Sequence, residues 1–181
     1  YVVEADIRGF FDNIDHEWMI KMLKERIDDR PFLGLIQKWL RAGILEEDGK
    51  VINPVTGTPQ GGIISPILAN IYLHYALDLW VEKEVKKCCK GQVILTRYAD
   101  DFICAFQHKD EAERFYKVLG ERLGKFGLTL AEEKTKVILF CRFKQKESER
   151  FDFLGFEFYW GKSRKGKNCL FKRTSRKKLK T

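Results

Sequence analysis

Two runs of strand-forming residues, Val93–Tyr98 and Phe102–Phe106, are separated by only three residues, Ala99-Asp100-Asp101. A connection this short joins antiparallel neighbours, because parallel strands need a crossover of a dozen or more residues. The chain is therefore predicted to build part of its core around a β-hairpin. The turn is chemically unusual, since adjacent carboxylates repel each other and Asn-Gly would be a more comfortable turn.

The remaining elements predict an α+β fold, in which an antiparallel sheet is covered on one face by helices. Helices are expected after Asp15, from Pro31 to Gly43, after a Ser65 N-cap and over 110–126. The other expected strands are 1–7, 128–130, 137–140 and 153–160, with a further hairpin at Asp48-Gly49. The chain contains no run of eighteen apolar residues, which excludes a membrane span. Its five cysteines form no C-x-x-C pair, which favours a reducing compartment over disulfides or a zinc site.

The positive charge lies almost entirely at the carboxyl-terminal end. Residues 162–181 hold ten Lys and Arg and no acidic residue, which leaves 24 of the 34 basic residues against all 26 Asp and Glu. Such an end is either a solvated tail or a phosphate-binding element. The Gly-rich basic stretch 161–167 separates two aromatic-bearing segments, which favours a hairpin. We therefore divide the chain into a globular part, residues 1–161, and a basic part, residues 162–181, which we expect to form a hairpin and the start of a connecting segment.

The Asp100-Asp101 pair has two interpretations. The residues are surface turn aspartates, or they bind a divalent cation at the rim of the sheet, since Mg²⁺ takes oxygen ligands. Asp6, at the end of the first predicted strand, is the natural third carboxylate if that strand lies beside the hairpin. Three carboxylates hold two cations about 3.5–4 Å apart in enzymes that activate a hydroxyl and stabilise a leaving group.

Five motifs, in order, resemble those of reverse transcriptases, and their variants are similar to the group II intron-encoded members, also called maturases. These motifs are Asp6-Ile7-Arg8-Gly9-Phe10-Phe11-Asp12-Asn13-Ile14, Gly57-Thr58-Pro59-Gln60-Gly61-Gly62-Ile63-Ile64-Ser65-Pro66-Ile67-Leu68-Ala69-Asn70, Tyr98-Ala99-Asp100-Asp101, Phe126-Gly127-Leu128-Thr129-Leu130 with Lys134-Thr135-Lys136, and Phe153-Leu154-Gly155-Phe156. The resemblance implies a right-handed polymerase palm, with fingers before Tyr1 and a thumb after about Ser175. The isolated chain is then expected to be inert, and to self-associate or retain a fingers fragment.

The resemblance also implies roles for residues of the first and third motifs. Asp6 and Asp100 would bind two Mg²⁺ ions, replaceable by Mn²⁺ in vitro, with the Ile7 carbonyl as a further ligand and Asp101 as a weaker one. Phe10 would exclude a ribose 2′-hydroxyl while Phe11 belongs to the core, although both are core residues on the simpler interpretation.

The same resemblance assigns contacts with the nucleotide or the nucleic acid to residues of the other motifs. Lys134, with Lys136 as its alternative, would protonate the leaving pyrophosphate. Pro59, Gln60 and Gly61 would contact the template, or form a loop without a ligand. Leu154 and Gly155 would form the primer grip, or part of an ordinary strand. Arg8 and Arg97 are further basic candidates for the site, or they simply pair with surface carboxylates. The three histidines match no motif position and are interpreted as structural or surface residues. The expected RNA-binding residues are Lys162, Arg164, Lys165, Lys167 and Arg173.

The implied function is an RNA-directed DNA polymerase that adds dNTPs to a DNA primer on an RNA template. The whole protein would also bind intron RNA and assist splicing, associated with nucleic acid in a bacterial or organellar interior and without a membrane. Two alternatives stay open, a non-catalytic RNA-binding splicing cofactor and a reverse transcriptase of the retron or diversity-generating type. A nucleotidyl cyclase palm lacks the Pro-Gln-Gly motif.

Overall fold

A computed structural model describes residues 1–42, 44–45, 51–52, 56–58, 63–144 and 146–175. In these ranges the main sheet has the strand order β5-β6-β1-β8, and every neighbouring pair is antiparallel. Its strands are β1 (Val2–Ala5), β5 (Val93–Tyr98), β6 (Asp101–Phe106) and β8 (Lys136–Ile138). The predicted hairpin is confirmed, since Tyr98 pairs with Asp101 and only Ala99 and Asp100 form the loop.

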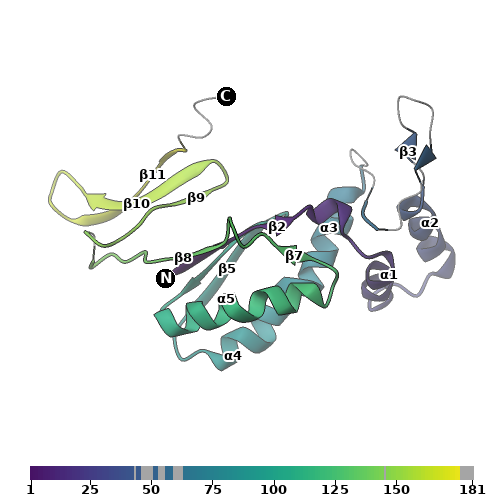
Figure 1. Cartoon of the computed structure of the whole chain (residues 1–181), viewed down its shortest axis with the longest axis horizontal. Coiled ribbons are helices and arrows are strands. Elements are labelled where there is room, and N and C mark those ends of the chain that lie inside the picture. Colours follow the sequence, from purple (N-terminus) through teal and green to yellow (C-terminus); the bar gives the residue numbers. More distant parts are fainter. Residues whose placement is uncertain (43, 46–50, 53–55, 59–62, 145, 176–181) are drawn as a thin grey trace.

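Helices pack against one face of this sheet (Figure 1). They are α3 (Ser65–Leu73) and α5 (Lys109–Gly124), whereas α1 (His16–Lys24) packs on α3 and α2 (Arg30–Leu40) packs on α1. The helix that begins at α3 continues through two π-helical turns, η2 (His74–Asp78) and η3 (Val81–Val85), into α4 (Lys86–Cys88). The α+β class expected from the sequence is confirmed.

The helix boundaries follow local signals in most cases. The Asp15 carboxylate accepts a hydrogen bond from the Trp18 amide at 2.9 Å, which confirms the predicted N-cap. After α5, Gly127 has a φ of 71° and the Leu128 amide donates to the Leu123 carbonyl, as in a Schellman motif. The predicted Ser65 cap is wrong by one residue, because Ile64 holds the cap position and Ser65 is already the buried first residue of α3.

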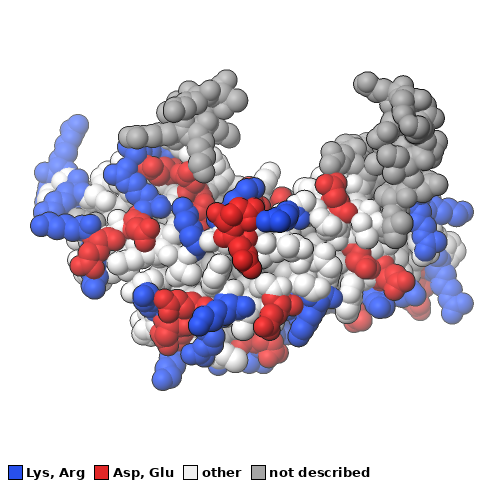
Figure 2. Space-filling view, in the orientation of Figure 1, with Lys and Arg blue, Asp and Glu red and all other residues white. Residues whose placement is uncertain are grey.

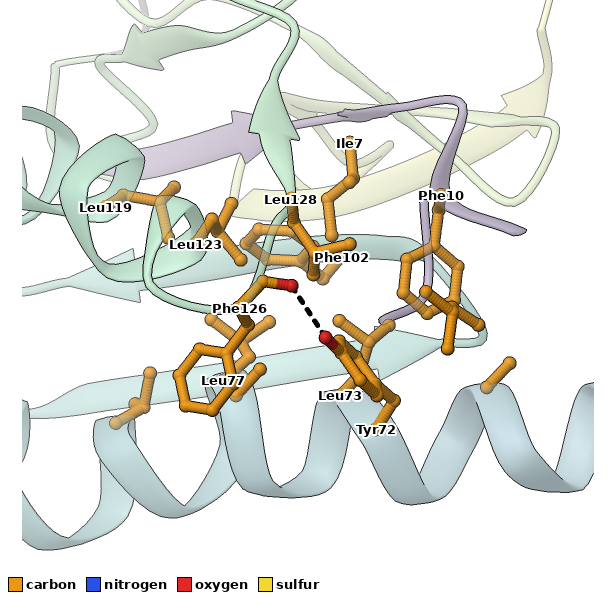
Figure 3. Close-up of a cluster of buried hydrophobic side chains, with 14 of the residues drawn as sticks. Ile7, Phe10, Tyr72, Leu73, Leu77, Phe102, Leu119, Leu123, Phe126 and Leu128 are labelled. Atoms are coloured by element: carbon orange, nitrogen blue, oxygen red, sulfur yellow. Dashed lines mark hydrogen bonds between the residues drawn. The ribbon is translucent and has the colours of Figure 1, made fainter. Parts of the chain in front are cut away.

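The core lies between the sheet and the long helix (Figure 3). Tyr72 and Leu73 from α3 meet Leu119 and Leu123 from α5 beneath Phe102 of β6, and all five side chains are at most 2% exposed. The buried Tyr72 hydroxyl donates to the Phe126 carbonyl at 2.6 Å, so the one polar atom of this layer is satisfied. Burial raises the pKa of this phenol far above its usual range.

The carboxyl-terminal part forms a second sheet of order β11-β10-β9. Its strands are β9 (Phe151–Phe153), β10 (Phe156–Lys162) and β11 (Asn168–Thr174). Phe151 packs on Val2 and Ile138, so this sheet covers part of the face that the helices leave free. The expected hairpin around residues 161–167 is present, and the boundary drawn after Gly161 falls inside β10.

The single strand predicted over 153–160 is wrong, because the chain turns sharply between β9 and β10. Leu154 and Gly155 both have positive φ angles, 51° and 78°, which is the signature of a two-residue hairpin loop. Aromatic residues are frequent on both sides of this turn, which concealed it, although their spacing changes from two residues to three between Phe153 and Phe156.

Two short ladders complete the described structure. Strand β2 (Ile7–Arg8) pairs with β7 (Thr129–Leu130), and β3 (Ile44–Leu45) pairs with β4 (Val51–Ile52) as the Asp48-Gly49 hairpin predicts, although the turn itself lies outside the described residues. Within the described ranges, no helix is both long and apolar enough to cross a membrane.

Candidate active site

The register of the main sheet brings Asp6 and Asp101 together. Strand β1 pairs with β6 so that Ala5 lies opposite Phe102. Because the strands are antiparallel, Asp6, which follows Ala5, and Asp101, which precedes Phe102, lie at the same end of this pair. Both aspartates line a groove of about 580 Å³, although they are 95 residues apart in the chain. The expectation that the first strand lies beside the hairpin is confirmed.

The carboxylates in this groove repel one another. The pKa of Asp101 is raised by partial burial, and then by the negative charges of Asp100 and Asp6. The Lys134 ammonium lies 2.7 Å from Asp6 Oδ2, and this hydrogen bond and charge raise the pKa of Lys134. An ammonium group therefore already lies against the Asp6 carboxylate in this groove.

The donor set suits a hard divalent cation, because carboxylate oxygens that repel each other are stabilised by a shared positive charge. Within the described part of the chain, however, no group of three or more His, Cys, Asp or Glu side chains is arranged to hold a metal ion. Asp100 sits in the hairpin loop, half-exposed, while Asp101 rather than Asp100 faces the groove with Asp6.

The structure reverses the predicted burial of the aromatic pair that follows Asp6. Phe10 is 2% exposed and packs in the core (Figure 3), whereas Phe11 is only partly buried. Both lie in the 3₁₀-helix η1 (Phe10–Asp12), where successive side chains point about 120° apart. Phe10 is the one of the two that points inward, and Gly9 just before it has a φ of 52°, in the left-handed region.

The expected template-contacting residues Pro59, Gln60 and Gly61 lie outside the described residues, but the segment that leads into them is anchored. The Gly57 amide donates to the Ile14 carbonyl at 2.7 Å, and the Thr58 amide donates to the Phe11 carbonyl at 2.8 Å. A Cβ atom on Gly57 would lie 2.9 Å from that same Phe11 oxygen, so only glycine allows this approach. Buried His16 contacts the Gly57 carbonyl through Nε2 at 2.6 Å, a structural role as expected.

The turn at Leu154-Gly155 lines the same groove as Asp6 and Asp101. The Ser175 amide donates to the Gly155 carbonyl at 2.9 Å and holds the turn from the end of β11. Two segments predicted separately, the first aspartate motif and the expected primer grip, are thus brought together across the two sheets.

Three acidic groove residues were missed by the sequence analysis: Glu4, Glu133 and Asp152. Glu4 pairs with Lys136 at 3.3 Å, and Glu133 pairs with Arg8 at 2.8 Å. Period-two alternation along β1, which puts residue 4 on the same face as residue 6, was the available signal for Glu4. The ion pair shows Arg8 as the partner of a carboxylate, the plainer of its two interpretations, and Lys136 is also paired with a carboxylate.

Basic side chains gather at the far end of the second sheet. Figure 2 shows acidic groups near the middle of the view, over β2 and β7, and basic groups at the end where β10 turns into β11. The turn carries the exposed residues Lys162, Arg164, Lys165 and Lys167. Arg173 differs from them, because its guanidinium pairs with Glu157 and lies over the Tyr159 ring.

Comparison with known proteins gives a family match over most of the chain. The family model described as reverse transcriptase (RNA-dependent DNA polymerase) matches residues 1–158. The group II intron-encoded protein LtrA of Lactococcus lactis subsp. cremoris is 51% identical over 81 residues, which is 45% of this chain and 13% of that protein. The putative COX1/OXI3 intron 1 protein of Saccharomyces cerevisiae is 42% identical over 93 residues, covering 51% and 11%. The chain therefore spans only a small part of these relatives.

Two further matches extend over nearly the whole chain. Protein YkfC of Escherichia coli is 28% identical over 193 residues, which covers 92% of this chain and 49% of that protein. Among solved structures, telomerase from Candida albicans, in complex with a TWJ fragment of telomeric RNA, superimposes with a TM-score of 0.68 at 16% identity. That match covers 87% of this chain and 30% of the telomerase chain, and at this identity it shows a shared fold.

Proposed function

Because the chain belongs to the reverse transcriptase family and resembles its group II intron-encoded members, we propose that it is the palm of an RNA-directed DNA polymerase. The reaction is nucleotidyl transfer, in which a primer 3′-hydroxyl attacks the α-phosphate of a dNTP and pyrophosphate leaves. The observation that carries the proposal is the β1–β6 register, because Asp6 and Asp101 flank the Ala5–Phe102 pair and line the same groove.

The residues proposed to hold two Mg²⁺ ions are Asp6, Asp100, Asp101 and the backbone carbonyl of Ile7. When bound, such ions lower the pKa of an attacking hydroxyl and neutralise charge on the leaving group. The chain contributes fixed, mutually repelling oxygen donors at one edge of a rigid sheet. Lys134, which donates a hydrogen bond to Asp6, is the residue proposed to give a proton to the departing pyrophosphate.

Other residues position the nucleic acid and the nucleotide in this proposal. Phe11, rather than the buried Phe10, excludes the 2′-hydroxyl of a ribonucleotide. The Leu154-Gly155 turn approaches the primer backbone, since it faces the same groove as the carboxylates. The glutamine motif, Pro59 to Gly61, contacts the template, and it follows the anchored residues Gly57 and Thr58 in the sequence.

The partners of the whole protein are proposed from its relatives, two of which are named as intron-encoded or intron proteins. They are an RNA template, a DNA primer, dNTPs and the intron RNA whose splicing the protein assists. The exposed basic turn of β10–β11 supports phosphate contacts, because single Lys and Arg side chains around a turn can reach a nucleic-acid backbone. Arg173 is the weakest of the proposed RNA contacts, since Glu157 already binds it.

Primer extension on an RNA template by the natural protein that contains this chain tests the proposal. Asp6→Asn and Asp100→Asn should each lower the rate about a thousandfold or more, since they remove ligands that stabilise transition-state charge. Asp110→Asn, an exposed carboxylate of α5, is the matched control and should leave the rate unchanged. Extension by Asp100→Asn within tenfold of wild type would refute the assignment and favour a non-catalytic RNA-binding cofactor.

A further inference from the structure

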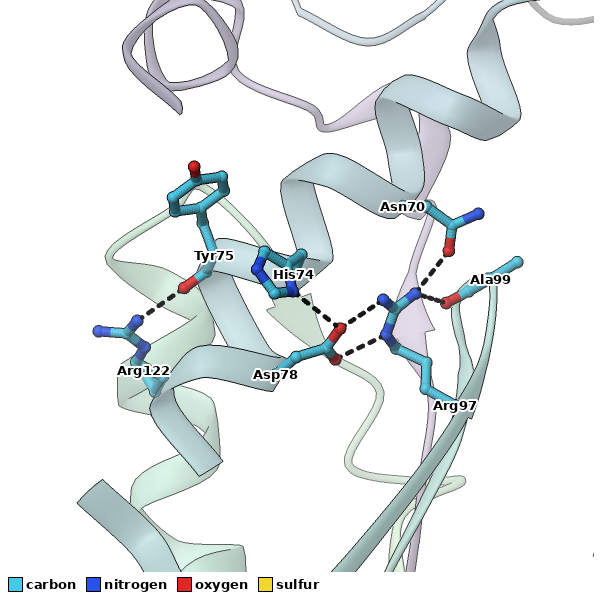
Figure 4. A network of polar contacts seen from close by, with 7 residues as sticks. All are labelled: Asn70, His74, Tyr75, Asp78, Arg97, Ala99 and Arg122. Carbon is cyan, nitrogen blue, oxygen red and sulfur yellow. Dashed lines mark hydrogen bonds and ion pairs between the residues drawn. The ribbon is translucent and has the colours of Figure 1, made fainter. Parts of the chain in front are cut away.

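Arg97 lies two residues before the hairpin loop and is bound by the long helix that crosses beneath it (Figure 4). Its Nε donates to Asp78 Oδ1 at 2.8 Å and its Nη2 donates to Asp78 Oδ2 at 2.6 Å, a bidentate pair. The Arg97 side chain is only 12% exposed, so this pair is shielded from solvent more than an ordinary surface ion pair. The geometry is the planar fork that arginine forms with a carboxylate and lysine cannot form.

The remaining guanidinium nitrogen connects the helix to the loop. Arg97 Nη1 donates to Asn70 Oδ1 at 2.8 Å and to the Ala99 carbonyl at 2.9 Å. One side chain thus joins α3, the π-helical turn η2 and the loop that carries the aspartate pair, as Figure 4 shows.

The π-helical turn explains how two helix residues can reach the same guanidinium. Asn70 and Asp78 are eight residues apart, which in a regular α-helix turns their side chains about 80° from each other. One extra residue in the turn at His74–Asp78 reduces this angle to about 20°, so both side chains face β5. On another side of the helix, Arg122 donates to the Tyr75 and Ala76 carbonyls and does not touch the hairpin.

The Ala99 carbonyl is the sensitive point of the loop. Ala99 has a φ of 53°, a left-handed conformation that residues with a Cβ atom rarely adopt. Its carbonyl belongs to the peptide group that leads directly into Asp100, so any change in this peptide reorients the aspartate pair. A hydrogen bond from a buried, doubly anchored guanidinium holds that peptide in place.

From this geometry we propose that Arg97 is a positioning residue for the catalytic carboxylates. Fixed by Asp78 and Asn70, it holds the Ala99-Asp100 peptide in the orientation that lets Asp100 and Asp101 act together with Asp6. The inference rests on the proposed function, since it assigns these carboxylates to metal binding. Partners that orient metal ligands from outside the coordination sphere usually change affinity or activity 10–100-fold when they are removed.

Arg97→Lys and Arg97→Gln test the proposal against Arg122→Gln as a matched control. All three remove hydrogen bonds from a partly buried arginine to the same helix, but only the Arg97 variants release the loop. Two quantities are measured in the natural protein, kcat and KM for dNTP in primer extension, and the Kd of Mn²⁺ alone by isothermal titration. Thermal unfolding of each variant reports the purely structural effect.

We expect both Arg97 variants to lower kcat about 100-fold with little change in KM, and to weaken Mn²⁺ binding about tenfold. Loss of the arginine charge alone would strengthen cation binding, so weaker binding by Arg97→Gln identifies positioning rather than charge. Arg122→Gln should lower the melting temperature but keep kcat and the Mn²⁺ Kd within threefold of wild type.

Two results would overturn the inference: Arg97→Lys with wild-type kcat and Mn²⁺ affinity, or equal losses in Arg122→Gln. If Arg97→Gln does not fold, Arg97→Lys, which keeps the charge, still decides through the same two measurements. A wild-type protein that extends no primer would refute the polymerase proposal instead, while the Mn²⁺ comparison would still report whether Arg97 orders the carboxylates.

Discussion

Replacing the two phenylalanines after Asp6 should separate a stability effect from a selectivity effect. Phe10 is 2% exposed and packs in the core, so Phe10→Ala should lower the free energy of unfolding by about 3–5 kcal/mol. Because whole domains are stable by only about 5–15 kcal/mol, much of the protein would unfold. Phe11 is only partly buried, and Phe11→Ala should cost roughly half as much and leave a folded protein.

In sugar selection the order should be reversed, because Phe11→Ala rather than Phe10→Ala should change the preference for dNTP over rNTP. A steric barrier against a single hydroxyl contributes about 1–3 kcal/mol, or roughly 10–200-fold in selectivity. Phe11→Ala should therefore lower the preference for dNTP over rNTP by up to about 100-fold, with little loss of dNTP incorporation. The ratio of kcat/KM for the two nucleotides measures this in primer extension, and urea unfolding followed by circular dichroism measures stability.

Phe32→Ala provides the matched control, because this half-exposed phenylalanine lies on α2 and not in the segment that follows Asp6. It should match Phe11→Ala in stability and wild type in selectivity. A folded Phe10→Ala protein that accepts ribonucleotides, together with a selective Phe11→Ala protein, would refute the assignment and restore the order expected from the sequence.

Three further outcomes follow from the structure. Tyr72→Phe leaves the buried Phe126 carbonyl without its donor and should lower the free energy of unfolding by about 1–3 kcal/mol in urea, whereas Tyr75→Phe should have a smaller effect. The raised pKa of Asp101 means that its charged form is unfavourable in the folded state, so the free energy of unfolding falls as pH rises through that pKa. Asp101→Asn should therefore raise the melting temperature at neutral pH. This gain should vanish at pH values below the ordinary pKa of aspartate, where Asp101 is protonated in both states. The salt dependence of RNA binding, log K against log[salt], should have a slope of about −3 for four phosphate contacts and flatten when all four basic side chains are replaced by Gln, namely Lys162, Arg164, Lys165 and Lys167.

Local signals in the sequence were sufficient for most elements. The β5–β6 hairpin, the Asp15 cap and the Gly127 helix end depend on hydrogen bonds between residues a few positions apart, so their sequence signatures predict them directly. The aspartate pair was also found from its residues, because two adjacent carboxylates in a tight turn need an explanation wherever the turn lies. Asp6 was inferred as the third carboxylate from its place at the end of the first predicted strand, and the family resemblance pointed to the same residue.

The helix packing was less accessible to sequence reasoning. The helix expected after Pro31 is present, but Phe32, Leu35 and Trp39 are each about 41–42% exposed while Leu33 and Ile36 are buried. Several apolar residues at helical spacing are compatible with more than one inward face, and only the surfaces opposite the helix select among them.

The sequence by itself therefore determined the α+β class, the family and the chemical character of the site, because each depends on composition, periodicity or short motifs. The tertiary structure decided which of Phe10 and Phe11 is buried, that Leu154-Gly155 turns into the groove of Asp6, and that Asp78 binds Arg97. These facts depend on the angle of a 3₁₀-helix, the packing of one sheet on another and an extra residue in a helical turn. Each joins residues far apart in the chain through geometry that no local pattern encodes.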